Sequence, residues 1–285
     1  MKVVSVVVPI YRNASTLEEL YFQLVEVFDQ LNDTLLELLF IDDGSDDASL
    51  ELIQNLSIRD ARVCFLSFDQ NYGQVAAIIA GLRHCSGDAA IVMSADLQDP
   101  PEMVLEMIRS WEGGSVITIC NRKSRNDRFV DIFFSAIFYG TMKLIYPLIP
   151  KGGFDFFLLD RSALLVFNSI DKGGRFIQGD VVKLKLPIEF LPYERLPRKV
   201  GKSQWTFKRK LLYAFDAFFY EDRVICLFVM FVFLFGFILM SGCNFVIDYP
   251  IFMTLIIIIC SVYCRFRNIL KKNKEHFYYR IERHS

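Results

Sequence analysis

The stretch AAIVMSADLQDPPE (residues 89–102) carries the signals that indicate the fold class of this chain. Its first five residues are small and apolar, as in a strand buried on both faces, and carboxylates and two prolines follow at once. Carboxylates at the C-terminal end of a strand in an α/β sheet lie at the edge where ligands bind. Asp96, Gln98 and Asp99 offer oxygen atoms, so the stretch predicts a Mg²⁺ or Mn²⁺ site that also holds a diphosphate. A plain surface turn is the alternative.

Strand and helix patterns alternate on both sides of this stretch. Continuous apolar runs predict strands over residues 3–10, 35–41, 63–68 and 89–93. Apolar residues at helical spacing predict helices from a cap at Ser15 or Thr16 to about residue 31, over 48–56 and over 74–84. Alternation at this spacing is typical of an α/β fold with a mostly parallel, doubly wound sheet.

Polar residues also follow the other three predicted strands. Tyr11 and Asn13 follow the first, the DDGS stretch of residues 42–45 follows the second, and the NYG stretch of residues 71–73 follows the third. An aromatic ring can stack on a nucleobase, a carboxylate can accept hydrogen bonds from a base or ribose, and Gly44 lets the backbone approach closely. A turn explains any one of these stretches, but four polar strand ends favour a single crevice.

Two long runs near the C-terminus contain no charged residue: Val224–Ile247 and Tyr249–Cys264. The first run would form a helix of roughly 36 Å, which can cross a bilayer core of about 30 Å. The second run is near the short limit, so a re-entrant or tilted segment stays open as an alternative to a full span. The two runs predict a transmembrane hairpin that anchors the protein in the lipid bilayer.

Basic residues flank this hairpin at both ends. Lys208, Arg209 and Lys210 lie upstream of it, further Lys and Arg residues follow between positions 265 and 274, and the connecting turn has none. The positive-inside rule therefore places both ends, and the large N-terminal region, in the cytoplasm. We expect a multi-pass protein of the plasma (inner) membrane.

Three parts of the chain are predicted from these patterns: a catalytic domain over residues 1–205, a juxtamembrane amphipathic helix over 206–223, and the hairpin with its tail over 224–285. Residues 130–149 are aromatic-rich but carry Asp131 and Lys143, which favours an amphipathic helix on the membrane face; an ordinary buried helix is equally compatible.

Composition excludes some functions. The formal net charge is −1, so nothing points to nucleic acid as a partner. The 7 cysteines have no metal-ligand spacing, and four of them lie in the uncharged runs, so we predict no disulfide framework and a reducing cytosol. The GKS triplet of residues 201–203 lacks the first glycine of a P-loop, because position 196 is Leu196.

Six motifs together resemble a known family. They are VVVPIYRN (6–13), FIDDGSDD (40–47), NYGQVAAIIAGL (71–82), ADLQDPPE (95–102), GGFDFFLLDR (152–161) and RLPRKVGKSQW (195–205). In order and spacing they resemble the family 2 glycosyltransferases of GT-A fold, and within them the polyprenyl-phosphate glycosyltransferases: the bactoprenol glucosyltransferase group, which is similar to dolichol-phosphate mannose synthases.

The resemblance implies a UDP-sugar donor, Mg²⁺ or Mn²⁺ as cofactor, and polyprenyl (undecaprenyl) phosphate as acceptor. It also implies roles for individual residues. Pro9, Tyr11, Asn13, Asp42, Asp43, Asn71 and Gly73 match the nucleotide-sugar pocket; Asp96 and Gln98, with Ser94 and Asp99 as weaker candidates, match the metal site; Asp155 matches an acidic residue near the sugar and acceptor, and we expect it and Asp96 to be catalytic; Arg195, Arg198 and Lys202 match a basic loop that meets phosphate.

The chain departs from the family pattern at three of these positions. Ser94 stands where the family usually has Asp, which removes one formal charge from the metal site; Asn13 stands where Glu is common, and Phe157 where Arg is usual. Asp180 is a second-choice acidic site residue, with an ordinary surface position as its alternative.

Three hypotheses follow. The leading one is an inverting glycosyltransferase that moves a hexose from a UDP-sugar to polyprenyl phosphate, for modification of a surface polysaccharide or glycan. The second keeps the donor and changes the acceptor to a lipid-linked saccharide. The third is a catalytically impaired membrane scaffold that binds nucleotide-sugar, as the loss of charge at Ser94 would allow. A homo-oligomer is compatible with all three.

Overall fold

The computed structural model describes residues 1–123, 139–140, 142–143, 145–170, 176–197 and 282–283. The chain divides into two compact units, and apart from Phe176 the described residues belong to the first, which comprises residues 1–171, 177–204 and 279–285. Both predicted membrane runs, the predicted juxtamembrane helix and the site candidates Arg198 and Lys202 lie outside the described residues. No helix in the described part is long and apolar enough to cross a membrane.

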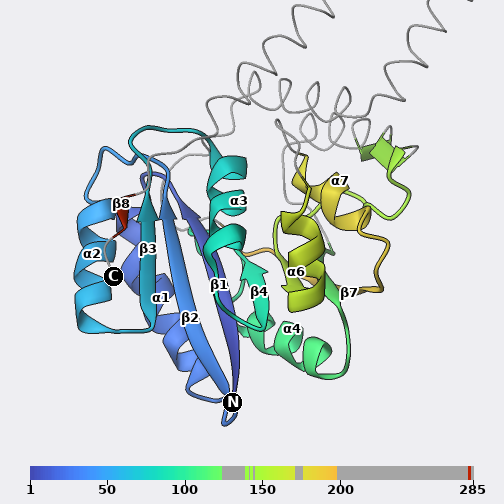
Figure 1. The fold of residues 1–285 in the computed structure, drawn as a ribbon, viewed down its shortest axis with the longest axis horizontal. Coiled ribbons are helices and arrows are strands. Elements are labelled where there is room, and N and C mark those ends of the chain that lie inside the picture. Colours follow the sequence, from blue (N-terminus) through green and yellow to red (C-terminus); the bar gives the residue numbers. More distant parts are fainter. Residues whose placement is uncertain (124–138, 141, 144, 171–175, 198–281, 284–285) are drawn as a thin grey trace, which may run out of the picture. The chain divides into compact units, whose positions relative to one another are not determined.

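An eight-stranded sheet organises the first unit, in the order β7-β5-β6-β4-β1-β2-β3-β8 (Figure 1). The strands are β1 (Lys2–Ile10), β2 (Thr34–Asp42), β3 (Val63–Ser67), β4 (Ala89–Val92), β5 (Ile117–Arg122), β6 (Phe157–Asp160), β7 (Ile188–Tyr193) and β8 (Glu282–Arg283). Strand β1 pairs in parallel with β2 and β4, β2 with β3, and β5 with β7. Strand β6 runs antiparallel between β4 and β5, and β8 is antiparallel to β3.

Helices cover both faces of this sheet (Figure 1). They are α1 (Ala14–Phe28), α2 (Ser49–Arg59), α3 (Gln74–His84), α4 (Glu102–Glu112), α6 (Arg161–Asn168) and α7 (Ile177–Val182). Alternate β1 residues, such as Val6 and Val8, join the core cluster with Leu20 of α1. Val7 faces the other way, toward Gly81 of α3, where an added Cβ would lie 2.2 Å from Val7 Cγ1. Glycine therefore lets α3 pack directly on the central strand.

The predicted strands and helices of the first hundred residues are confirmed, with shifts of a few residues at some ends. The predicted cap of α1 is wrong. The helix begins after Asn13, and Thr16 lies within its first turn, where its buried hydroxyl donates to the Ala95 carbonyl at 2.7 Å. That bond ties the first turn of α1 to the loop after β4.

The structure also describes Asp180 and part of residues 130–149, for which the sequence left alternatives. The surface alternative for Asp180 is wrong, because this residue is only 3% exposed within α7. In the described end of residues 130–149, Met142, Tyr146 and Ile149 are each 1% exposed and Leu148 is 52% exposed, a pattern that both alternatives for this segment allow. The three described cysteines, Cys64, Cys85 and Cys120, are free thiols.

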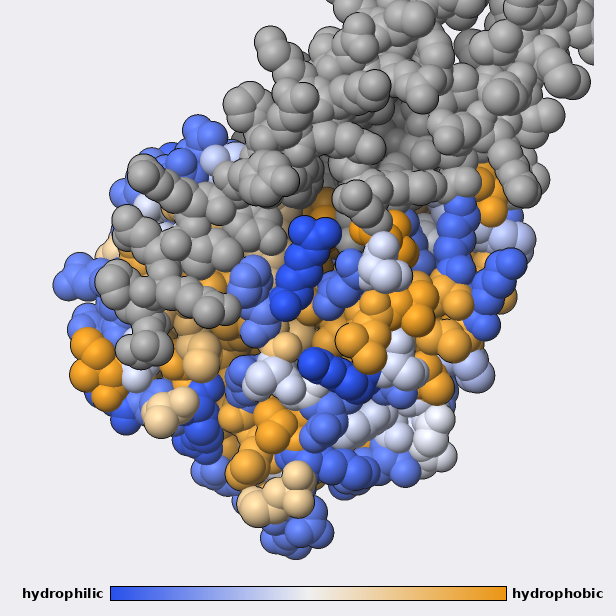
Figure 2. Space-filling model, in the orientation of Figure 1, coloured by the Kyte–Doolittle hydropathy of each residue, from blue (hydrophilic) through white to orange (hydrophobic). Residues whose placement is uncertain are grey.

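Apolar side chains also gather on part of the surface. Figure 2 shows hydrophobic residues grouped over α6, where Leu165 and Val166 are 60% and 46% exposed. The rest of this described face alternates between hydrophilic and hydrophobic residues (Figure 2).

Candidate active site

The carboxyl ends of four neighbouring strands form one edge of the sheet. Because β4, β1, β2 and β3 are adjacent and parallel, the polar residues that follow them meet along that edge, as the sequence predicted. This is the edge at which open α/β sheets bind ligands.

The Asp43 carboxylate organises the ends of β2 and β3. It accepts hydrogen bonds from the Tyr72 N–H at 2.7 Å, from the Gly73 N–H at 2.9 Å and from the Asn71 side-chain amide at 3.0 Å. Asp43 is 3% exposed, so these donors replace the water that its charge would otherwise need. A carboxylate that the sequence assigned to a nucleotide thus holds together the turn that begins α3.

Asp42 has a similar position at the end of β2. It is 1% exposed and accepts from the Ser45 N–H at 3.3 Å and from the Ser67 hydroxyl at 3.2 Å. Gly44 lies between the two tethered loops at φ +66°, and a Cβ there would lie 2.5 Å from the backbone carbon of Gln70. Gly44 therefore permits a close approach of two loops, whereas the predicted approach to a nucleotide stays a prediction.

The β1 end contributes a partly exposed aromatic ring. Pro9 is buried, whereas Tyr11 and Asn13 are half-buried. The Asn13 side chain accepts from the Tyr11 N–H at 3.0 Å, and the Arg12 guanidinium lies over the Tyr11 ring at 5.1 Å while pairing with Asp46. Tyr11 is therefore held at this edge of the sheet.

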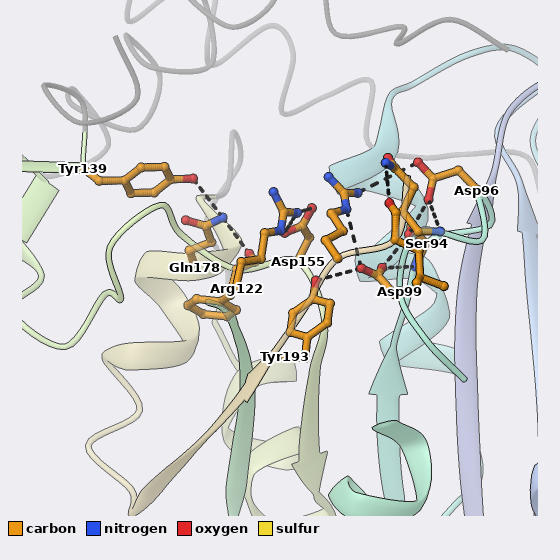
Figure 3. Close-up of polar contacts among 12 residues, drawn as sticks. Ser94, Asp96, Asp99, Arg122, Tyr139, Asp155, Gln178 and Tyr193 are labelled. Atoms are coloured by element: carbon orange, nitrogen blue, oxygen red, sulfur yellow. Dashed lines mark hydrogen bonds and ion pairs between the residues drawn. The ribbon is translucent and has the colours of Figure 1, made fainter. Parts of the chain in front are cut away.

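Residues 94–99, termed the carboxylate loop below, follow β4 (Figure 3). The Ser94 hydroxyl lies 2.8 Å from an Asp96 oxygen and 2.5 Å from an Asp99 oxygen, so it links the two acids. Leu97 is buried at a left-handed φ of 58°, and this turn lets the Gln98 N–H reach the same Asp96 oxygen at 3.3 Å. A left-handed leucine is uncommon and persists only where surrounding contacts hold it.

Asp99 is the structural anchor of the carboxylate loop. It is 0% exposed, and its two oxygens accept from the Tyr193 hydroxyl at 2.8 Å and from Ser94. Burial raises the pKa of Asp99, and the Asp155 charge raises it further, while Arg195 and the hydrogen bonds from Ser94 and Tyr193 oppose the rise. A carboxylate enclosed in this way is poorly placed to bind a metal, so the structure favours Asp96 over Asp99 for that role.

The second catalytic candidate, Asp155, lies before β6 and is 39% exposed. One terminal nitrogen of Arg122, at the end of β5, donates to both Asp155 oxygens at 2.8 and 2.7 Å (Figure 3). The buried Gln178 amide of α7 donates to the carbonyl of the preceding residue, Phe154, at 2.6 Å. Asp155 is therefore held through its side chain and through its neighbouring peptide.

A short segment after β7 brings the cation Arg195 to the carboxylate loop. Its guanidinium nitrogens lie 3.9 Å from Asp96 and 3.8 Å from Asp99. With Arg122 beside Asp155, two guanidinium groups face three carboxylates at the ends of β4 to β7. Such groups can neutralise a phosphate-bearing ligand.

The donor atoms at the carboxylate loop fit a hard divalent cation. Asp96 supplies a carboxylate, Ser94 a hydroxyl and Gln98 an amide oxygen, and Mg²⁺ is commonly held by one or two carboxylates together with substrate phosphates. In the described part of the chain no three His, Cys, Asp or Glu side chains converge as a metal cage.

Sequence reasoning missed Arg122, Tyr193 and Gln178. Arg122 could have been found, because it is a charged residue that directly follows an apolar strand pattern, like the other site residues. Tyr193 and Gln178 gave no local signal, since their partners Asp99 and Phe154 are far away in the sequence. Phe157, a departure from the family pattern, is a core residue in β6, 1% exposed, with its ring 5.7 Å from that of Phe154.

Comparisons with known proteins agree with this geometry. Residues 5–165 match the family model described as glycosyl transferase family 2. The chain is similar to the uncharacterized glycosyltransferase YkcC of Bacillus subtilis, with 35% identity over 74% of this chain and 66% of that protein. It is also similar to the bactoprenol glucosyl transferase of Shigella phage SfV, with 30% identity over 71% of this chain and 66% of that protein. The matched part thus spans just under two thirds of these relatives.

A solved structure shows the same fold at low sequence identity. Glucosyl-3-phosphoglycerate synthase of Mycobacterium tuberculosis, in complex with Mn²⁺, UDP and phosphoglyceric acid, superposes with a TM-score of 0.53 at 15% identity, over 75% of each chain.

Replacing Gly44 with alanine tests the close approach of the two loops. Gly44→Ala should lower the midpoint of thermal unfolding, because the new Cβ displaces the backbone at Gln70. Gly114→Ala is the matched control, since Gly114 also has positive φ but open space around its Cβ. Equal effects of the two substitutions on the unfolding midpoint would contradict the steric argument.

The pH dependence of stability tests the buried state of Asp99. Because the pKa of Asp99 is raised in the folded protein, the folded state retains the proton longer, and Asp99 contributes less stability as pH rises above about 4. Relative to Asp99→Asn, the unfolding midpoint of the wild-type protein should therefore fall as pH rises above about 4, the pKa of an ordinary Asp. The opposite slope would indicate an ionised, ligand-like Asp99.

Proposed function

The chain belongs to glycosyl transferase family 2, and from this premise we propose that it moves a hexose from a UDP-sugar to polyprenyl phosphate at the cytoplasmic face of the plasma membrane. That it is a glycosyltransferase with an α/β fold of the GT-A type follows from the family match, the relatives and the sheet order. One observation carries the finer proposal: Asp96 and Asp155 lie at one edge of the sheet with two guanidinium groups, from Arg122 and Arg195.

For the donor, the proposal places UDP along the ends of β1, β2 and β3. Tyr11 has the ring that could stack on the base, and Asn13, Asn71 and Gly73 border the same edge. Asp42 and Asp43 shape this pocket by holding its loops. The solved relative with UDP and Mn²⁺ supports such a donor for this fold.

For the metal, the proposal assigns Mg²⁺ or Mn²⁺ to Asp96, with the oxygens of Gln98 and Ser94 as further ligands. When bound, a divalent cation stabilises the negative charge of the leaving diphosphate as a Lewis acid. The protein itself contributes the neutral hydroxyl of Ser94 where the family has a carboxylate, so we expect weaker metal affinity than in relatives with Asp at that position.

The proposed acceptor is argued from the charge of its phosphate and of the basic residues that would meet it. A phosphate monoester is largely ionised at neutral pH, since its second pKa is about 6, and it needs little help from a base. Arg195, with Arg198 and Lys202 outside the described residues, would neutralise the acceptor or the donor diphosphate. Asp155, oriented by Arg122, would position the sugar, and in-line displacement would invert the anomeric centre.

The membrane hairpin completes the proposal. A polyprenyl acceptor stays in the bilayer, so the enzyme must work at its surface. The uncharged runs over residues 224–264 would anchor it there with the catalytic domain in the cytoplasm. The relative named bactoprenol glucosyl transferase supports this acceptor class.

Incubation of the purified chain with radiolabelled UDP-hexoses, Mg²⁺ or Mn²⁺ and undecaprenyl phosphate tests the proposal. We expect label in an acid-labile lipid, because a glycosyl phosphate ester breaks under mild acid. Label found only in a larger glycan would favour the lipid-linked saccharide as acceptor. Nucleotide binding without any transfer would favour the impaired scaffold.

Asp96→Ala tests the metal assignment. We expect a loss of metal-dependent turnover of at least 100-fold, with an unfolding midpoint close to that of the wild type, because Asp96 is partly exposed whereas Asp99 is the buried anchor. Asp33→Ala is the control, since Asp33 is an exposed acid before β2, at the opposite edge of the sheet. Wild-type turnover in Asp96→Ala would refute the assignment.

A further inference from the structure

Five contacts join the carboxylate loop to the end of β7 and the residues after it. This segment, residues 193–196, is termed the β7 extension. The Tyr193 hydroxyl donates to Asp99 at 2.8 Å, Arg195 lies 3.9 Å from Asp96 and 3.8 Å from Asp99, and Leu196 makes two backbone hydrogen bonds with Gln98. The two segments are almost a hundred positions apart in sequence, so only the tertiary structure brings them together.

Gln98 forms its two hydrogen bonds to Leu196 with different groups, one from its backbone and one from its side chain. Its carbonyl accepts from the Leu196 N–H at 2.8 Å, as in a strand pair. Its own N–H cannot return the bond, because the left-handed turn at Leu97 aims it at Asp96. The side-chain amide nitrogen donates to the Leu196 carbonyl instead, at 3.1 Å.

This contact fixes which way the Gln98 amide points. A nitrogen must face the Leu196 carbonyl, since two oxygens at that distance would repel each other. The amide oxygen is then the only side-chain atom of Gln98 that can serve a cation. The Gln98 side chain can therefore bind a cation through its oxygen while its nitrogen donates to the β7 extension.

We propose that Gln98 is a positioning residue that clasps the β7 extension, and with it Arg195, to the carboxylate loop. The clasp holds the diphosphate-binding side and the cationic side of the crevice in one unit, so that both meet their ligands in a fixed relative geometry. The inference rests on the proposed function only for the ligands that it assigns to the two sides.

Gln98→Glu separates this role from metal binding. Glutamate keeps the size and the oxygen and adds a charge that a cation favours, but it cannot donate to the Leu196 carbonyl. We expect Mn²⁺ alone to bind the variant at least as tightly as it binds the wild type. Hydrogen–deuterium exchange at the Leu196 amide should rise roughly tenfold or more, the factor that corresponds to one hydrogen bond of about 1.4 kcal/mol.

Two further variants keep the test decisive. Gln98→Met lacks both amide functions without adding charge, and it should raise Leu196 exchange even if the glutamate variant fails to fold. Gln30→Glu is the matched control, because the exposed Gln30 side chain also donates to a backbone carbonyl, that of Glu26, at 3.1 Å. It should leave Leu196 exchange unchanged.

Wild-type exchange at Leu196 in the Gln98 variants overturns the clasp, and so does an equal rise in Gln30→Glu. Neither exchange nor Mn²⁺ titration requires glycosyl transfer. A failure of the wild-type chain to glycosylate polyprenyl phosphate would therefore refute the proposed function without deciding the clasp.

Discussion

The parallel pairing of β1 with β2 and β4 is the constraint on which the rest of the structure depends. Strand β1 pairs with β2 over its whole length, and Val4 to Val7 pair with the whole of β4. Because side chains alternate across a strand, a slip of one residue would exchange the β1 side chains that face α1 with those that face α3, and it would move the polar strand ends out of line. Residues Val4–Ile10 are buried, and the two faces pack against different helices, so the side chains on each face must match their own helix and the strand ends stay aligned at one edge of the sheet.

Within that frame, charge burial decides which acids face the crevice. Asp42, Asp43 and Asp99 are almost fully buried, and their oxygens accept hydrogen bonds from protein donors. Asp96 and Asp155 are partly exposed and lie beside arginines. A buried carboxylate is costly unless it is hydrogen-bonded, so the first group makes the loops rigid. The second group keeps access to ligands. The division of labour among five acids is therefore set by their environments and not by their residue type.

Ser94 shows how a departure from the family pattern fits its surroundings. Its hydroxyl lies within hydrogen-bonding distance of both Asp96 and Asp99, where a third carboxylate would lie beside two others. Its one proton can be donated to either acid, so a repulsive contact is replaced by a hydrogen bond, and one charge is removed from the proposed metal site. At this position serine thus favours the stability of the loop, whereas aspartate would favour affinity for a cation.

The sequence by itself determined the first four strands, the first three helices, the edge of the sheet at which polar residues gather, and the family, because apolar periodicity and turn residues are local signals. The antiparallel β6 was not foreseen, since the direction of a strand depends on its neighbours. Only the tertiary structure decided that Asp99 is an anchor, that Arg122 holds Asp155, and that Gln98 grips Leu196. These are pairings between distant segments, and a side chain's role depends on which donor or acceptor the fold places beside it.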